Sequence, residues 1–117
     1  LIKVYSRNSY CVGIVIVVYV SNTERFLIAS HIKPWKDSDE NERLDIDNGL
    51  LLCPNHDKAF DRGYISFDDN GLIIISDELD DTNRVFLNLR QDMSIKLTDG
   101  NREYLKYHRK NIMVINR

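Results

Sequence analysis

Apolar, β-branched runs separated by short polar turns make up the first quarter of the chain. The run from Tyr10 to Val20 is rich in valine and isoleucine and is typical of a β-strand. A polar turn at Ser21-Asn22-Thr23 separates it from a second run, Arg25 to Ser30, so we expect the two runs to pair as a hairpin. His31 follows the second strand directly, and Pro34 ends regular structure soon afterwards.

A polar and acidic segment then separates this region from a helix. Lys36 to Asp47 predicts a loop, and Asn48-Gly49 opens a short leucine-rich run that we interpret as a strand. A proline is well placed in the first turn of a helix, which predicts a helix from Pro54 to about Arg62. Gly63 is the expected residue just beyond its end.

The second half of the chain indicates another hairpin and a last helix. Tyr64 to Phe67 and Leu72 to Ser76 flank Asp68-Asp69-Asn70-Gly71, and Asn-Gly between apolar runs is a strong hairpin signal. The pattern from Thr82 to Leu97 is compatible with strands or with a short helix. A helix is predicted from Arg102 to about Asn111. The order of elements predicts an α+β fold.

The length and composition fit one globular domain, residues 1–117. The chain begins at Leu1 rather than methionine, so we expect a domain cut from a longer protein. The longest apolar run, Val12 to Val20, is shorter than the roughly 20 residues that cross a bilayer, so no membrane partner is expected. Two cysteines, Cys11 and Cys53, do not suggest a disulfide framework, and a reducing cytoplasm is the expected location.

The net charge of −2 is unusual for a chain that binds nucleic acid. The charge is distributed unevenly, however. The segment from Asp37 to Asp47 is acidic, whereas the segment from Asn101 to Arg117 is basic. Because the local field around a cleft matters more than the total charge, this composition does not exclude DNA as a substrate.

Three residues suggest a specific chemistry through their type and spacing. His31 ends a strand, Asn48 follows 17 positions later (48 − 31), and His56 follows 8 further on (56 − 48) near a helix start. Neutral imidazole suits the removal of a proton from attacking water, and it also binds divalent metals. An amide cannot act as a base, but it can orient an imidazole or hold a loop through hydrogen bonds.

The sequence blocks around these residues resemble a known family. Leu27 to Trp35 (LIASHIKPW), Asn48 to Cys53 (NGLLLC) and His56 to Gly63 (HDKAFDRG) are similar to the HNH domain at the C-terminus of predicted restriction endonucleases. Tyr104 to Asn111 is similar to that group's last helix. The resemblance implies a ββα-metal (His-Me finger) nuclease core, with an additional β-hairpin and a C-terminal helix. It also implies a metal-dependent endonuclease that hydrolyses phosphodiester bonds of double-stranded DNA.

The resemblance also assigns roles to residues. It implies a one-metal mechanism in which His31 is the general base, Asn48 the organiser of the loop and His56 a metal ligand. The implied cofactor is Mg²⁺ or Mn²⁺, with Ni²⁺ or Zn²⁺ as alternatives. Ser30 occupies the position where many family members have a second ligand. Asp61 is the candidate for that role, or else a structural salt-bridge partner.

Three basic residues near these motifs are candidates for DNA phosphate contacts, or else part of a solvated surface: Lys33, Lys58 and Arg62. Arg109, on the predicted last helix, is a further candidate for a DNA-backbone contact, or else a structural residue. Sequence specificity is expected to come from another domain. A homodimer of the full-length protein is left open.

The sequence is also compatible with two functions other than catalysis. Cys53 and His56 resemble half of a zinc site, and Cys11 with His31 could complete it, which would make the domain a structural zinc module. Alternatively, the serine before His31 fits a domain that binds DNA without cutting it.

Overall fold

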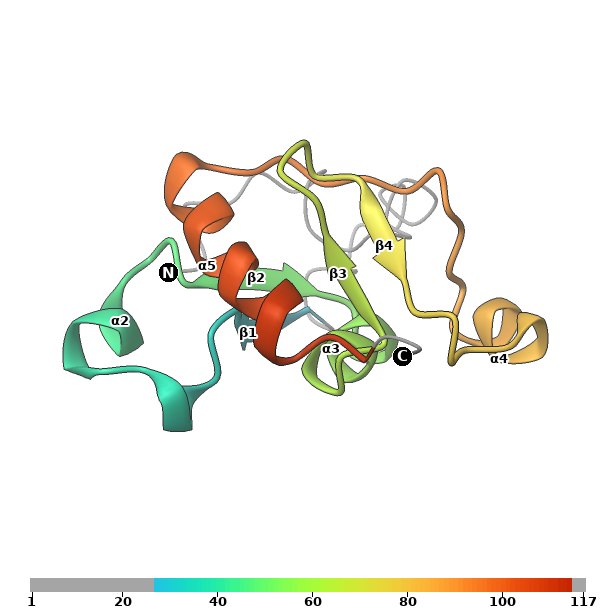
Figure 1. The fold of residues 1–117 in the computed structure, drawn as a ribbon, viewed down its shortest axis with the longest axis horizontal. Coiled ribbons are helices and arrows are strands. Elements are labelled where there is room, and N and C mark those ends of the chain that lie inside the picture. Colours follow the sequence, from blue (N-terminus) through green and yellow to red (C-terminus); the bar gives the residue numbers. More distant parts are fainter. Residues whose placement is uncertain (1–26, 115–117) are drawn as a thin grey trace.

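The computed structural model describes residues 27–114 of the chain. The predicted strand from Tyr10 to Val20, and its pairing as a hairpin, lie outside the described residues. The elements follow one another in this order: β1 (Ile28–His31), η4 (Trp35–Asp37), α2 (Glu40–Leu44), β2 (Gly49–Leu52), α3 (Pro54–Asp61), β3 (Ile65–Phe67), β4 (Ile73–Ile75), α4 (Asp81–Phe86) and α5 (Asp99–Asn111). Figure 1 shows their arrangement and labels all of them except η4.

The first sheet and the helix after it form a ββα unit. β1 pairs antiparallel with β2, in a register that sets Ile28 opposite Leu52 and His31 opposite Gly49. Asn48 directly precedes β2, so His31 and Asn48 lie at the same end of this sheet. α3 follows at once and packs against both strands. This arrangement confirms the predicted α+β class with a ββα core.

α3 ends as the sequence predicts. Pro54 lies in its first turn, and its buried face carries His56, Ala59 and Phe60. Gly63 follows with a φ of 79°, in the left-handed region that favours glycine. A Cβ at Gly63 would also lie 2.1 Å from the carbonyl oxygen of Ile112, so the chain after α5 can pass here only because the side chain is absent.

The second hairpin is also confirmed, with β3 and β4 paired around the turn that contains Asn70 and Gly71. In the segment from Thr82 to Leu97, for which strands and a short helix were both expected, the structure has a short helix, α4. Asp80 caps this helix, because its carboxylate accepts from the N–H of Asn83. α5 begins three residues earlier than predicted, because Thr98 and Asn101 form a reciprocal capping box at its start. No helix in the described part of the chain is long and apolar enough to cross a membrane.

The core lies between α3, β3 and α5, where Phe60, Phe67 and Leu105 are fully buried. A histidine is buried among them. The imidazole of His108 stacks on Phe60 with 3.8 Å between ring centroids. Its Nε2 donates to the carbonyl oxygen of Phe60 and its Nδ1 accepts from the Ser66 hydroxyl, each at 2.9 Å. Burial lowers the pKa of His108 to about 4, so the neutral ring joins α5 to α3 and β3.

Acidification is expected to destabilise this fold through His108. Its pKa in the folded state, about 4, lies below the ordinary value of 6.5, so the unfolded chain takes up a proton first as the pH falls. The stability that the neutral His108 ring contributes is fully present above pH 6.5 and is lost as the pH falls toward 4. The free energy of unfolding should fall by roughly 3 kcal/mol between pH 6.5 and pH 4, as measured by chemical denaturation at a series of pH values.

The control is His108→Gln, which keeps a polar side chain but cannot titrate. This variant should be less stable at neutral pH, and its unfolding free energy should depend much less on pH. An equally steep pH dependence in both proteins would show that other groups cause it.

Candidate active site

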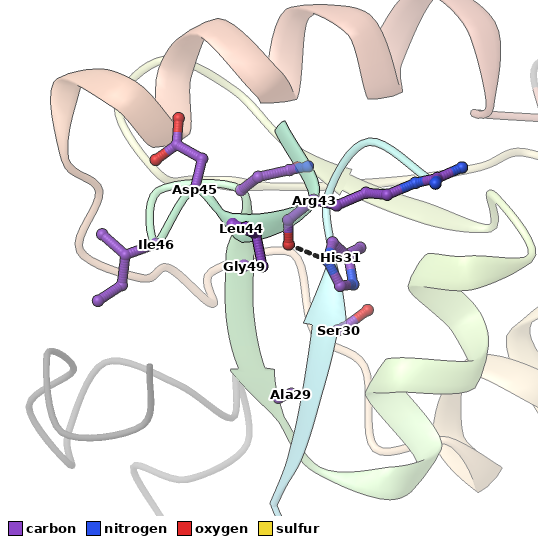
Figure 2. A pocket seen from close by; sticks show the side chains of 9 residues that line it. Ala29, Ser30, His31, Arg43, Leu44, Asp45, Ile46 and Gly49 are labelled. Atoms are coloured by element: carbon purple, nitrogen blue, oxygen red, sulfur yellow. Dashed lines mark hydrogen bonds between the residues drawn. The ribbon is translucent and has the colours of Figure 1, made fainter. Parts of the chain in front are cut away.

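His31 is oriented by a backbone carbonyl from the neighbouring loop. Its Nε2 lies 3.1 Å from the carbonyl oxygen of Arg43. The dashed line in Figure 2 marks this contact. A carbonyl only accepts hydrogen bonds, so Nε2 carries the hydrogen and Nδ1 of the neutral ring keeps its lone pair. The Trp35 ring meets the imidazole edge-on, with centroids 5.5 Å apart. The imidazole is therefore held with one nitrogen ready to accept a proton.

Asn48 holds that loop from inside. Its side chain is 1% exposed. Its Oδ1 accepts from the Lys33 N–H at 2.8 Å, and its Nδ2 donates to the Glu42 carbonyl oxygen at 3.0 Å. Glu42 directly precedes Arg43, so Asn48 and His31 bind consecutive carbonyl groups. The amide thereby links the start of the loop to the turn that contacts His31.

A cleft of about 650 Å³ opens beside His31. Charged side chains of both signs line it together with His31: Lys36, Asp57, Lys58, Asp61 and Arg62. A smaller cavity of about 230 Å³ also reaches His31 and is lined by Arg43, Leu44 and Asp45 (Figure 2). The carboxylate of Asp45 already accepts hydrogen bonds within the protein. The larger cleft is therefore the candidate site for chemistry.

Two carboxylates from α3 face this cleft. Asp57 and Asp61 are four residues apart on the helix, so they lie on the same face. The Ser30 hydroxyl contacts Asp61 Oδ1 at 3.5 Å. Burial raises the pKa of Asp57, the Ser30 hydrogen bond lowers it, and the charge of Asp61 raises it further. Two carboxylates at this spacing repel each other, and a divalent cation would relieve the repulsion.

The structure does not bring His56 into the cleft. Its side chain is 1% exposed, and its Nε2 lies 3.1 Å from the carbonyl oxygens of both Leu87 and Asn88. These acceptors require a hydrogen on Nε2. Burial lowers the pKa of His56, with the two carbonyl contacts opposing it. In this arrangement His56 links α3 to the segment after α4. Asp57, the next residue, faces the cleft instead, and the sequence analysis did not single it out.

The candidate DNA-binding residues fall into two groups. Lys58 and Arg62 line the cleft, as does Lys36, which the sequence analysis did not name. Lys33 instead pairs with Glu42 at 2.9 Å, and this bond raises the pKa of the lysine. Arg109 donates to the Phe67 carbonyl oxygen at 2.7 Å and pairs with Asp69 at the second hairpin. Lys33 and Arg109 therefore make contacts within the fold.

The described residues fit a thin, oxygen-rich metal site better than a zinc module. Among residues 27–114 there is no cluster of three or more histidine, cysteine, aspartate or glutamate side chains that could hold a metal. Cys53 is disulfide-bonded, so its thiolate is not available to zinc, and nothing in the sequence indicated this bond. Two aspartates with water in the remaining positions would suit Mg²⁺, which prefers oxygen and keeps several waters.

Comparisons with known proteins match part of the chain to one family. Residues 13–68 match the model of a family described as HNH endonuclease. No curated protein matches the chain. Among solved structures, it is similar to a modification-dependent TagI restriction endonuclease, with 22% identity and a TM-score of 0.49. That similarity covers 76% of this chain and 28% of the other, so the chain spans less than a third of that protein's length.

Removal of the Asn48 amide should destabilise the loop. In Asn48→Ala, the Lys33 N–H and the Glu42 carbonyl lose their buried partner, and each unsatisfied group costs about 1–3 kcal/mol. The free energy of unfolding, measured by urea denaturation, should fall by about 3 kcal/mol. Asn41→Ala, at an exposed position on α2, is the matched control and should change it by less than about 0.5 kcal/mol. Similar losses in both variants would mean that Asn48 has no special role.

Proposed function

We propose that this protein hydrolyses phosphodiester bonds of double-stranded DNA with the help of one divalent metal ion, in keeping with the match of residues 13–68 to an HNH endonuclease family. One observation carries this proposal. A single cleft contains the oriented imidazole of His31, two carboxylates on one face of α3, and three basic side chains. These are the groups that phosphodiester hydrolysis requires: a base, a place for a cation, and positive charge toward the phosphate.

His31 is the general base of the proposed reaction. Its Nδ1 takes the proton from the water that attacks the phosphorus atom. The Arg43 carbonyl accepts from Nε2, so it holds the ring in position and stabilises the positive charge that the ring gains. Asn48 contributes through the loop, because it fixes the peptide group next to that carbonyl.

Asp57 and Asp61 would hold the metal ion through their carboxylate oxygens, with water and DNA phosphate oxygens as the other ligands. When bound, the ion supplies charge neutralisation at the phosphate and stabilises the leaving oxygen. An all-oxygen set suits Mg²⁺ and Mn²⁺. This proposal transfers the ligand role expected of His56 to Asp57 and keeps Asp61 in the role expected from the sequence.

Lys36, Lys58 and Arg62 would contact DNA phosphates on either side of the cut bond. Contacts of this kind carry no sequence information, so they suit a module whose specificity comes from elsewhere in a longer protein. We therefore propose a cleavage module of a restriction-type enzyme. A negative net charge is compatible with this role, because these three basic side chains all line the cleft.

Plasmid cleavage in a metal titration tests the proposed roles. His31→Ala should lower the cleavage rate by roughly 10²- to 10⁴-fold at saturating Mg²⁺ or Mn²⁺, which is the usual contribution of a general base. Asp57→Asn and Asp61→Asn should each raise the metal concentration for half-maximal cleavage about tenfold or more. Asp77→Asn, at an exposed position outside the cleft, is the matched control and should leave both quantities unchanged.

His56→Ala separates the two ligand assignments. The buried imidazole is lost, so the variant should unfold more easily, but its metal requirement should match that of the wild type at a temperature where it is folded. A raised metal requirement in His56→Ala with a normal one in Asp57→Asn would overturn the assignment to Asp57.

The salt dependence of DNA binding tests the basic residues. Binding measured without divalent metal should weaken in Lys36→Ala, Lys58→Ala and Arg62→Ala for every DNA sequence tested. Each variant should also lower the slope of log affinity against log salt by about 1, because one phosphate contact releases about one counterion. Lys110→Ala, at an exposed position on α5, should leave the slope unchanged. An equal effect of Lys110→Ala would indicate that only the total charge matters.

A further inference from the structure

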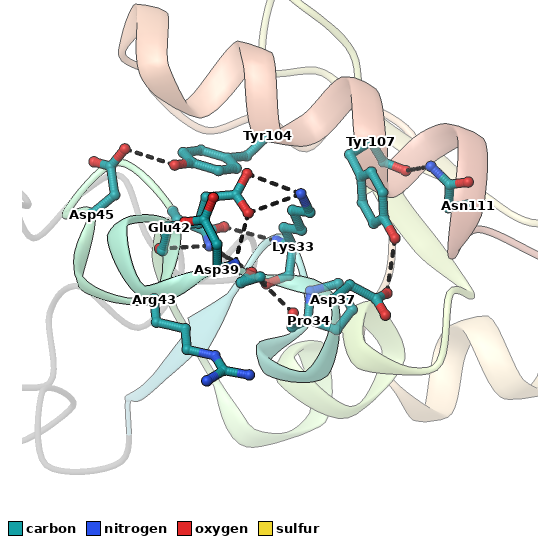
Figure 3. Close-up of polar contacts among 12 residues, drawn as sticks. Lys33, Pro34, Asp37, Asp39, Glu42, Arg43, Asp45, Tyr104, Tyr107 and Asn111 are labelled. Atoms are coloured by element: carbon teal, nitrogen blue, oxygen red, sulfur yellow. Dashed lines mark hydrogen bonds and ion pairs between the residues drawn. The ribbon is translucent and has the colours of Figure 1, made fainter.

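Hydroxyl groups from α5 and its cap bind carboxylates of the loop between β1 and β2. Tyr104 donates to Asp45 Oδ2 at 2.7 Å, and Tyr107 donates to Asp37 Oδ2 at 2.9 Å (Figure 3). The hydroxyl of Thr98, the N-cap of α5, donates to Asp47 Oδ1 at 2.9 Å. The acidic residues of this loop therefore serve as acceptors for groups that lie at least 51 positions later in the chain.

α2, the short helix within this loop, depends on such polar contacts for its position. It has five residues and none of them is buried, and its last residue, Leu44, is 84% exposed. A helix of this length is marginal unless other parts of the protein hold it. None of its residues is buried in the apolar core, so polar contacts hold it. They are the Lys33–Glu42 ion pair, the bond from Arg43 Nε to the Trp35 carbonyl oxygen, and hydrogen bonds at the ends of the helix.

Asp45 is the residue through which α5 contacts the end of α2. It is the C-cap of the helix, two positions after Arg43, and its N–H donates to the Glu42 carbonyl oxygen at 3.3 Å. Its carbonyl oxygen accepts from the Asn48 N–H, and its Oδ1 accepts from the Asp47 N–H, each at 2.9 Å. Only Oδ2 bonds to α5, through Tyr104. Burial and the Asp45 contact raise the pKa of Tyr104, so its hydroxyl stays protonated and donates.

We propose that Tyr104 is a positioning residue for the hydrolysis: its bond to Asp45 fixes the end of α2, so that the Arg43 carbonyl meets Nε2 of His31. Asn48 holds the same turn from inside the protein, and Tyr104 holds it from the side of α5. The catalytic part of this inference rests on the proposed function, because it requires His31 to be the base. The structural part of the inference, which concerns only the orientation of the imidazole, does not rest on the proposed function.

Tyr107 provides a matched control on the same helix. Its hydroxyl makes the same kind of bond, but to Asp37 in η4, at the opposite end of the loop from Arg43. That bond is exposed to solvent, whereas the Tyr104 bond is partly buried. Removal of either hydroxyl takes away one contact between α5 and the loop, yet only Tyr104→Phe should disturb the carbonyl that orients His31.

The first experiment measures plasmid cleavage by Tyr104→Phe and Tyr107→Phe in the full chain at saturating metal. Tyr104→Phe should lower kcat roughly tenfold and leave KM for DNA within about twofold, because a displaced base impairs the chemical step rather than binding. Tyr107→Phe should keep both constants within about twofold of the wild type. Equal losses of kcat in the two variants, or a loss in KM alone for Tyr104→Phe, would overturn the proposal.

The second experiment reads the orientation of His31 without any activity. Nitrogen NMR of the imidazole in the neutral state should show hydrogen on Nε2 in the wild type and in Tyr107→Phe, and a mixture of the two tautomers in Tyr104→Phe. An unchanged tautomer in Tyr104→Phe would overturn the proposal. If the wild type does not cut DNA, the proposed function fails, and the NMR result alone decides whether Tyr104 positions the ring.

Substitutions at Asp45 complete the test. Asp45→Ala removes the acceptor, so it should lower kcat at least as much as Tyr104→Phe, and the double variant should be no worse than Asp45→Ala alone. Asp45→Asn keeps a hydrogen-bonding group opposite Tyr104 and should recover most of the rate. Additive losses in the double variant would show that the two side chains act independently, against the proposal.

Discussion

The buried side-chain amide of Asn48 bonds to backbone groups of two residues that are not neighbours in the sequence. It accepts from the N–H of Lys33, 15 positions earlier, and donates to the carbonyl of Glu42, six positions earlier. Backbone polar groups that lie inside a protein need partners, so this one side chain makes a polar, acidic loop compatible with a position against the core. The geometry of His31 follows from it, because the next carbonyl along the loop is the one that the imidazole contacts.

Electrostatics explains how an acidic chain can present a site for a polyanion. Carboxylates of the loop, such as Asp37 and Asp45, accept hydrogen bonds from tyrosine hydroxyls of α5. The charge of Glu42 is balanced by Lys33, which is not among the residues that line the cleft. What remains along the cleft is a pair of aspartates that would favour a cation, surrounded by lysine and arginine. The total charge of −2 is thus a poor guide to the field that DNA would meet.

The sequence predicted the parts of the structure that depend on local patterns. The strand end at His31, the helix after Pro54, the glycine at its end and the Asn-Gly hairpin all follow from short-range preferences. The proposed assignment of the metal ligand to Asp57 rather than His56 could not be made in this way, because neighbouring residues on a helix point about 100° apart and either could face the cleft. Imidazole is the more familiar metal ligand, so type alone favoured His56, whereas packing turned it toward Leu87 and Asn88. One signal for Asp57 was present, namely its four-residue spacing to Asp61. The Tyr104–Asp45 contact spans 59 positions and has no local signature.

The long separation of these contacts also bears on when the site is completed during synthesis. β1, the loop, β2 and α3 emerge from the ribosome well before α5, the source of the hydroxyls that hold the loop carboxylates. Until the last helix docks, the loop carboxylates lack these hydroxyl partners, whereas the Asn48 amide and the Lys33–Glu42 ion pair already lie within the part of the chain that has been made. The final packing of the loop, and with it the finished surroundings of His31, would therefore be reached only once this domain is fully made.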